Sequence, residues 1–458
     1  MRQTVLLVVA VTLLLGACVS AEEAAARKRP DPVRTAVDRA SLAGSIDTVA
    51  RSRYLSSYSS SLRTVRGLSG IRRTELAYVV RTLQRIARAK RLTADRMRPL
   101  FLILDRNRQW WSRSGPPAAN ARLHFSPSLV VFQYYPGRGL QLQPLANFAT
   151  LNAYWSGRKD SALETLAGEL VDLSVSRSGF AAWEYYFHFG GGSPPWVSGM
   201  AQATAMQALA RASRRLEDPE LLEVARRARG AFERNTPTGA RVPVGTRAWY
   251  ALYSFDPRLE VLNGMLQSLI GLETYVSYSN DADAAALFDQ GDSLARSRIG
   301  RYDTGAWSLY SRSPSGAGAE ASLNYHLLNR DFSRRLCGET GAVEYCDAAD
   351  RFDLYLHEDP VITPLDTSPD LGRAGRPLKI RFKLSKISRV GITARAGDRT
   401  YLSTSATFAH GSRFVRWVPP RVGRERTYEL SLSARDLAGN SSSAEATFEV
   451  KGAPKPKR

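Results

Sequence analysis

The stretch RYDTGAWSLYSRSPSGAGAEASLNYH, residues 301–326, joins two segments that have helical periodicity. It holds three tyrosines, one tryptophan and one histidine beside a run rich in Gly and Ser. Connections between helices are usually polar, so aromatic hydroxyls at this density indicate that the loop carries chemistry as well as a turn. The alternative, in which Tyr302, Trp307 and Tyr310 only pack between helix ends, stays open.

Helical patterns extend outward from this loop in both directions. Apolar positions at a spacing of 3.6 predict helices at Leu145–Trp155, Leu163–Leu173, Ser198–Ala212, Pro219–Phe232, Leu259–Tyr275, Ala282–Arg296, Ala319–Phe332 and Val343–Leu356. Gly- and Pro-containing loops separate them, and no strict repeat is visible. Helix pairs joined in this way favour a mostly α fold, an (α/α) barrel or toroid that keeps its chemistry in the loops at one end.

Residues 37–358 are predicted to form this helical domain, including two or three amphipathic helices between Val37 and Trp111. A β-hairpin is expected inside it, because Leu129–Tyr135 is rich in strand formers and Pro136–Gly139 reads PGRG, a turn sequence.

The pattern changes at residue 359. Apolar and polar residues alternate along Leu378–Leu384 and again along Tyr428–Ala434, which is the period of a half-buried strand. Residues 359–452 are therefore predicted to be an all-β sandwich of immunoglobulin-like type, with Trp417 in its core. Residues 453–458 are predicted to be a disordered basic tail.

The N-terminus reads as an export signal. Residues 1–20 contain an apolar run, Val5–Leu15, that is too short to span a bilayer comfortably. Leu15–Cys18 has the form of a bacterial lipobox, which predicts acylation of Cys18 and a membrane anchor, although simple cleavage after Ala21 stays open. Residues 21–36 are predicted to be a tether. The protein is expected outside the cytoplasm, as a cell-envelope lipoprotein or a secreted protein.

The cysteine and histidine contents limit the chemistry. Cys337 and Cys346 are predicted to form a disulfide, because a close pair outside the cytosol is more often a bridge than a metal site. The five histidines are scattered and none belongs to a metal-binding or cofactor motif. We expect neither a metal nor a cofactor.

The net charge of +21 comes mostly from arginines spread along the whole chain. Nucleic-acid-binding tails concentrate such charge in blocks, so no nucleic-acid partner is expected. An acidic polysaccharide drawn in by the positive field and a merely solvated basic surface are both consistent with this distribution. Aromatic residues also gather in the loops, and their faces suit sugar rings.

Four blocks of the sequence carry a family resemblance. They are WVSGMAQA at 196–203, VLNG at 261–264 followed by SLIGL at 268–272, YDTG at 302–305, and NYH at 324–326. Their order and spacing resemble the C-terminal domain of D-glucuronyl C5-epimerases. That family converts glucuronate to iduronate within a polysaccharide by removing and returning the proton at C5.

The resemblance implies a set of site residues. Tyr253, Tyr310 and Tyr325 match the catalytic tyrosines of the family. The matching motifs also imply substrate-binding roles for Trp196, Gln202, Tyr250, Asn263, Trp307 and His326, and for His326 a structural role is favoured over that of a base. The C5 proton lies beside a carboxylate, so the site should neutralise that charge, and an arginine-lined cleft would also lower the tyrosine pKa. The implied partner is a uronate polysaccharide.

The sequence departs from the family pattern at two places. At one of them, the arginine that family members can show shortly before the Tyr-His pair is absent, and Ala321–Asn324 reads ASLN. Where the family has Trp-Tyr-Glu-Glu-Tyr, Ala251 and Leu252 replace the two glutamates. The substitute bases that we consider are Glu184, Asp256, Glu260 and Asp303. A catalytically impaired polysaccharide-binding envelope protein and a uronate polysaccharide lyase therefore stay open as alternatives to an epimerase.

Overall fold

The computed structural model describes residues 30–313, 316, 318–368 and 372–453 and divides the chain into two compact units. One unit runs to Arg122 and takes in Gln133–Gln141; the other comprises Leu123–Phe132 and Leu142–Arg458. The region 37–358, expected as one domain, is thus shared between two units. Cys18, the signal sequence and residues 454–458 lie outside the described residues.

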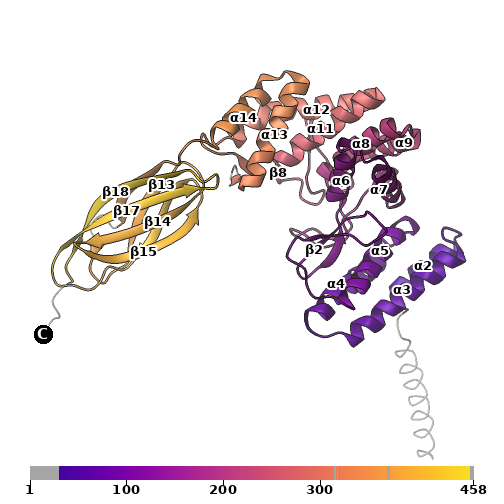
Figure 1. Ribbon diagram of the computed structural model, residues 1–458, viewed down its shortest axis with the longest axis horizontal. Helices are drawn as coiled ribbons and strands as arrows, with labels where there is room; N and C mark the ends of the chain where they lie inside the picture. The colour runs from indigo at the N-terminus through magenta and orange to yellow at the C-terminus, as the bar shows by residue number, and fades with distance from the viewer. Residues whose placement is uncertain (1–29, 314–315, 317, 369–371, 454–458) are drawn as a thin grey trace, which may run out of the picture. The chain divides into compact units, whose positions relative to one another are not determined.

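Four helices make up most of the first unit (Figure 1), where two or three were expected. They are α2 (Pro32–Leu42), α3 (Thr48–Gly67), α4 (Gly70–Arg88) and α5 (Ala94–Trp111). Helix α2 begins early because the carboxylate of Asp31 accepts hydrogen bonds from the amides of Val33 and Arg34, and proline is favoured at the first helical position. Residues 32–36, expected in the tether, are therefore helical.

The predicted hairpin is present, with β2 (Phe132–Tyr135) and β3 (Gly139–Leu142) beside the short β1 (Arg122–Leu123). The buried carboxylate of Glu75 holds its turn: it accepts hydrogen bonds from the Tyr134 hydroxyl (2.8 Å) and from the amides of Gly137 (2.7 Å) and Gly139 (2.6 Å). Gly139 has φ +73°, and a Cβ there would lie 2.5 Å from the Asn107 side chain. Only glycine fits this position without strain.

Helices of the second unit form four consecutive hairpins. The helices are α6 (Pro144–Ser156), α7 (Asp160–Asp172), α8 (Gly199–Leu216), α9 (Pro219–Ala228), α10 (Gly230–Glu233), α11 (Leu262–Ser279), α12 (Ala282–Ile299), α13 (Leu323–Thr340) and α14 (Val343–Leu354). Helices α6, α8, α11 and α13 touch in that order, and they pack against α7, α9, α12 and α14 respectively.

The mostly helical prediction is confirmed for this region, while closure into a barrel stays a prediction. Helices α8 and α11 approach so closely that a Cβ on Gly271 would lie 2.4 Å from the carbonyl oxygen of Ala203. Within the described part of the chain, no helix combines the length and the apolar character needed to cross a membrane.

Short strands and turns fill the connections before α8, α11 and α13. They are β4 (Val175–Arg177), β5 (Phe180–Ala182), β6 (Arg241–Val244), β7 (Arg247–Tyr250), β8 (Glu260–Val261), the 3₁₀ turn η1 (Gly300–Tyr302), β9 (Leu309–Arg312) and β10 (Gly318–Glu320). Strands β8, β9 and β10 form one antiparallel sheet. Ala319 and Glu320, expected at the start of a helix, belong to this sheet, and α13 begins only at Leu323.

The C-terminal region forms two sheets around one core, drawn in yellow in Figure 1. The strands are β11 (Ile362–Ser368), β12 (Gly372–Arg373), β13 (Leu378–Leu384), β14 (Ser388–Ala396), β15 (Arg399–Phe408), β16 (Gly411–Trp417), β17 (Arg426–Asp436) and β18 (Ser441–Lys451). The sheets have the orders β11-β13-β16 and β12-β18-β17-β14-β15. Trp417 packs in their core as predicted, whereas the immunoglobulin-like assignment stays a prediction.

Cys337 and Cys346 form the predicted disulfide, with 4.9 Å between their Cα atoms. The bridge links the last turn of α13 to the first turn of α14.

Replacing Glu75 by Gln should destabilise the first unit by about 3 kcal/mol, because an amide cannot accept all three hydrogen bonds and leaves buried donors unpaired. Chemical denaturation followed by circular dichroism measures this change. Glu164→Gln, at an exposed carboxylate of α7, is the control and should change the stability by less than about 0.5 kcal/mol. Equal unfolding curves for the two variants would contradict the role given to Glu75.

Candidate active site

Three tyrosines from separate segments meet in the second unit. Tyr253 lies in the loop after β7, Tyr310 in β9 and Tyr325 in the first turn of α13. The hydroxyl of Tyr310 shares hydrogen bonds with those of Tyr253 and Tyr325, and the ring centres of Tyr310 and Tyr325 are 4.5 Å apart. The structure therefore brings together all three tyrosines that the resemblance implied. We call these residues the tyrosine cluster.

An apolar floor supports the tyrosine cluster. Buried Met200, Leu252 and Val261 form this floor, and Tyr253 and Tyr310 pack against it. Met200 is in the first turn of α8, Val261 immediately precedes α11, and Tyr325 is in the first turn of α13. The cluster thus lies at the N-terminal ends of three neighbouring helices, where the loops of the hairpins converge.

Burial differs among the three hydroxyl-bearing side chains. Tyr325 is 41% exposed, whereas Tyr253 and Tyr310 are half-buried. Burial raises the pKa of Tyr310 well above its ordinary value, and the neighbouring Tyr253 and Tyr325 raise it further. The largest contributions all raise this pKa, so the expectation that it is lowered is wrong for Tyr310. At neutral pH Tyr310 is a proton donor.

Aromatic rings line one side of the tyrosine cluster. Trp196 stacks on Tyr185 with 4.2 Å between ring centres and meets Tyr253 edge-on at 5.9 Å. Phe189 and Phe255 lie 5.4 and 5.5 Å from Tyr253 and are half-buried, whereas Trp196 is 4% exposed. Trp196 therefore supports Tyr253 from within. The two phenylalanines, which motif matching missed, are the more accessible rings, and the aromatic density of 183–189 was the signal for Phe189 in the sequence.

Several residues implied to bind substrate are inside the protein. Gln202, Tyr250, Asn263, Trp307 and His326 are each at most 2% exposed. Gln202 donates a hydrogen bond to the Trp183 carbonyl, and Tyr250 donates one to the Leu287 carbonyl. The structure gives these side chains a packing role in place of the expected contact with substrate.

His326 fixes the loop that carries the tyrosines. Its ring stacks on Trp307 with 3.7 Å between centres, Nε2 donates to the Phe352 carbonyl (2.8 Å), and Nδ1 accepts from the Ser308 amide (3.2 Å). Burial lowers the pKa of His326 to about 4, so the ring is neutral. The structural reading of His326 is the one that the geometry supports.

The carboxylates considered as substitute bases are mostly engaged elsewhere. Glu184 pairs with Arg177, Glu260 with Arg298, and Asp303 with Arg351. Asp256 lies in the turn that follows Tyr253, where its amide donates to the Tyr253 carbonyl (3.0 Å).

Ala251 and Leu252, the positions of the missing glutamates, are 0% and 9% exposed. A carboxylate at either position would be buried against the apolar floor.

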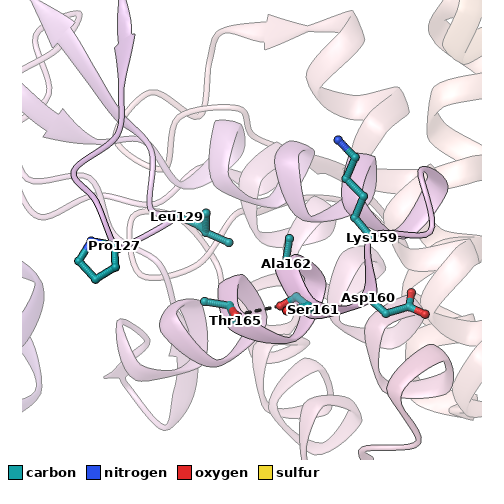
Figure 2. Close-up of a pocket in the computed structure, with 7 residues that line it drawn as sticks. All are labelled: Pro127, Leu129, Lys159, Asp160, Ser161, Ala162 and Thr165. Carbon is teal, nitrogen blue, oxygen red and sulfur yellow. Dashed lines mark hydrogen bonds between the residues drawn. The ribbon is translucent and has the colours of Figure 1, made fainter.

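A surface pocket of about 520 Å³ has none of the clustered tyrosines in its lining (Figure 2). Its lining residues are Pro127, Leu129, Lys159, Asp160, Ser161, Ala162 and Thr165. Asp160 is paired with Arg215, and the Thr165 hydroxyl donates to the Ser161 carbonyl. This pocket therefore offers little polar functionality for catalysis. Among the described residues, no group of three or more His, Cys, Asp or Glu side chains is placed to hold a metal ion.

Stability should fall as the pH drops from 6.5 toward 4, because the unfolded chain binds a proton at the ordinary histidine pKa of 6.5 and the folded one only near pKa 4. Stabilisation by neutral His326 is complete above pH 6.5 and is worth about 3 kcal/mol in total. Denaturation at several pH values should show that the free energy of unfolding depends less on pH in His326→Gln than in the wild type. His357→Gln, at an exposed site, should keep the wild-type slope; parallel slopes for all three proteins would contradict this account.

Comparison with known proteins links the cluster to one family. The model of the D-glucuronyl C5-epimerase C-terminus matches residues 177–353. The D-glucuronyl C5-epimerase of Caenorhabditis elegans is 27% identical over 180 residues, which cover 36% of this chain and 29% of that protein. An uncharacterized protein of Methanocaldococcus jannaschii is 24% identical over 180 residues, covering 38% and 57%. The chain spans less than two thirds of either relative.

Among solved structures, cellobiose 2-epimerase from Spirochaeta thermophila is similar with a TM-score of 0.35 and 16% identity, over 46% of this chain and 54% of that one. This likeness is too low to add to the assignment. The matched segment contains the whole tyrosine cluster and its aromatic wall. Residues 177–353 of this chain match the family model of the D-glucuronyl C5-epimerase C-terminus, and the similarity to the Caenorhabditis elegans epimerase supports this family assignment.

Proposed function

We propose that this protein inverts C5 of D-glucuronate residues within a polysaccharide and yields L-iduronate. The observation that carries the proposal is the convergence of three phenolic hydroxyls beside half-buried aromatic rings. A pyranose ring can pack its apolar face on Phe189 and Phe255 while its C5 faces the tyrosine cluster. The family assignment supports the same reaction type.

The chemistry requires proton transfer on both faces of the sugar ring. One group removes the C5 proton and another returns a proton from the opposite side. Tyr310 is suited to the second role, because its raised pKa keeps it protonated. The first role then falls to Tyr253 or Tyr325.

The hydrogen bonds of the cluster make a phenolate base accessible. When one tyrosine loses its proton, a neighbouring hydroxyl can donate a hydrogen bond to the resulting anion and so favours it. In this proposal, the base of the cluster is a phenolate that accepts such a hydrogen bond. By the same proposal, the hydrogen-bonded tyrosines take over the role of the glutamates that the family has at the positions of Ala251 and Leu252.

Arg312 is the cation that we propose for the uronate carboxylate. It follows Tyr310 by two residues in β9, and alternate residues of a strand share one face. Its guanidinium is held by a hydrogen bond from Nη1 to the Arg301 carbonyl (2.7 Å), while the remaining N–H groups suit a carboxylate. Neutralising this charge lowers the cost of removing the adjacent proton.

The partner that follows is an anionic uronate polysaccharide, attracted by the net charge of +21. A location outside the cytoplasm, with a lipid at Cys18 or after simple cleavage, accords with a polymer of the cell envelope and is part of this proposal.

A second candidate function is glycan binding without turnover. The apolar burial of Ala251 and Leu252, where the family has glutamates, favours it. The two functions differ in whether C5 hydrogen exchanges with solvent.

Heavy-water incubation with a heparosan-type polymer tests the proposal. The wild type should incorporate deuterium at C5 and form iduronate. Tyr310→Phe should lower inversion by about 100-fold or more, because the returning acid is lost, yet retain washout of the C5 hydrogen. Tyr253→Phe or Tyr325→Phe should abolish washout, depending on which of them is the base.

Tyr154→Phe, on α6, is the control and should match the wild type. Unsaturated uronate ends in place of exchange would identify a lyase. Polymer binding with neither exchange nor cleavage would identify the glycan-binding alternative.

Arg312→Ala should raise KM for the polymer by about ten-fold or more, since a charged hydrogen bond to each bound uronate is lost. Arg312→Lys should recover part of the loss, and Arg227→Ala on the exposed face of α9 should have no effect. Steady-state kinetics at low salt measure all three. An unchanged KM for Arg312→Ala would remove this residue from the site.

A further inference from the structure

Glu320 connects the tyrosine-bearing loop to the C-terminal sandwich. It is the last residue of β10, and its side chain is 2% exposed. Oε1 accepts a hydrogen bond from the Ile387 amide (2.8 Å), Oε2 accepts one from the His410 amide (2.8 Å), and Nδ1 of His410 lies 3.0 Å from Oε2. Ile387 is in the β13–β14 turn and His410 in the β15–β16 turn. Two turns of the sandwich therefore hold one carboxylate.

Glu320 stands between two members of the tyrosine cluster. In the β9–β10 ladder it pairs with Leu309, the residue before Tyr310. The next residue, Ala321, donates its amide to the Ser308 carbonyl and accepts from Trp307 Nε1. Helix α13, which carries Tyr325, begins two residues later. A displacement of Glu320 would reach both tyrosines through a short, hydrogen-bonded path.

Lys386 lies next to Ile387 in the β13–β14 turn and links this turn to the end of the helical part. Its ammonium group pairs with Asp436 (2.8 Å) and donates to the carbonyls of Tyr355 (2.8 Å) and Glu358 (2.5 Å), with both charged side chains at most 1% exposed. The Lys386 Nζ also lies 5.6 Å from the centre of the Trp307 ring. Separating these partners would leave a buried charge unpaired, which is costly. The turn at 386–387 is therefore rigidly attached to the helical part.

We propose that Glu320 is a positioning residue and that the sandwich, acting through it, holds β9 and the start of α13 so that Tyr310 and Tyr325 meet. The sandwich is then a working part of the site in addition to any spacing or binding role. The activity part of this inference rests on the proposed epimerase function. The structural part does not.

Hydrogen exchange of backbone amides in the full-length protein tests the structural part. Glu320→Ala should increase exchange of residues 308–313 and 318–326 by about ten-fold, because hydrogen bonds to a buried carboxylate are lost, and leave α8 unchanged. Glu320→Gln, which keeps one acceptor oxygen, should show exchange rates between those of the wild type and Glu320→Ala. Glu445→Ala, at an exposed carboxylate of β18, is the matched control. Wild-type protection of residues 308–313 and 318–326 in Glu320→Ala would overturn the proposal.

Kinetics on the uronate polymer test the functional part. Glu320→Ala should lower kcat by about ten-fold or more, since the reacting hydroxyls move. KM should rise by less, because Arg312 lies on the same strand β9 while Phe189 and Phe255 stay in place. If Glu320→Ala shows faster amide exchange in the loop but a wild-type kcat, the positioning role of Glu320 is refuted. If the wild type itself shows no turnover, the proposed function fails and the exchange experiment alone decides on Glu320.

If Glu320→Ala does not fold, His410→Ala offers a milder change, because the backbone amide of residue 410 still donates. His410→Ala should raise the rate of backbone amide exchange of residues 308–313 and 318–326 by about three-fold. No rise in exchange for that variant would contradict the proposal.

Discussion

The hydrogen bonds that join Tyr310 to Tyr253 and Tyr325 are the constraint on which the site depends. They require three segments to meet: the loop after β7, strand β9, and the first turn of α13. Pairing of β9 with β8 and β10, the stack of His326 on Trp307, and the apolar floor under Tyr253 all serve this convergence. Helices α8, α11 and α13 pack against one another, and the loops that carry the site lie at their N-terminal ends.

The proposed reaction builds up negative charge in a site that has few charged side chains. The proposed uronate substrate would bring a carboxylate into the site, and deprotonation at C5 would add more negative charge. The structure buries apolar side chains at the two positions where the family has glutamates, so the resting site carries no carboxylate there. Phenols linked by hydrogen bonds can supply both a proton and a stabilised anion without a permanent negative charge. This is why the loss of the glutamates does not by itself exclude proton transfer.

Sequence periodicity predicted the elements well where a single face is buried, as in α7, expected at Leu163–Leu173 and found at Asp160–Asp172, and in β13. It failed where one interaction overrides the pattern. Asp31 starts α2 inside the expected tether, and pairing with β9 makes Ala319 and Glu320 a strand although both residues favour helices. The motifs located the three tyrosines correctly. They could not reveal that Gln202, Trp307 and His326 are buried, because burial depends on contacts between distant segments.

A crystal structure with a heparosan-type hexasaccharide bound tests the central claim most directly. We expect one glucuronate ring against Phe189 and Phe255, with the hydroxyl of Tyr310 and that of a second clustered tyrosine on opposite faces of C5 at about 3–3.5 Å, the range of near-attack geometry. A saccharide bound away from the cluster, or hydroxyls that stay on one side of the ring, would contradict the account.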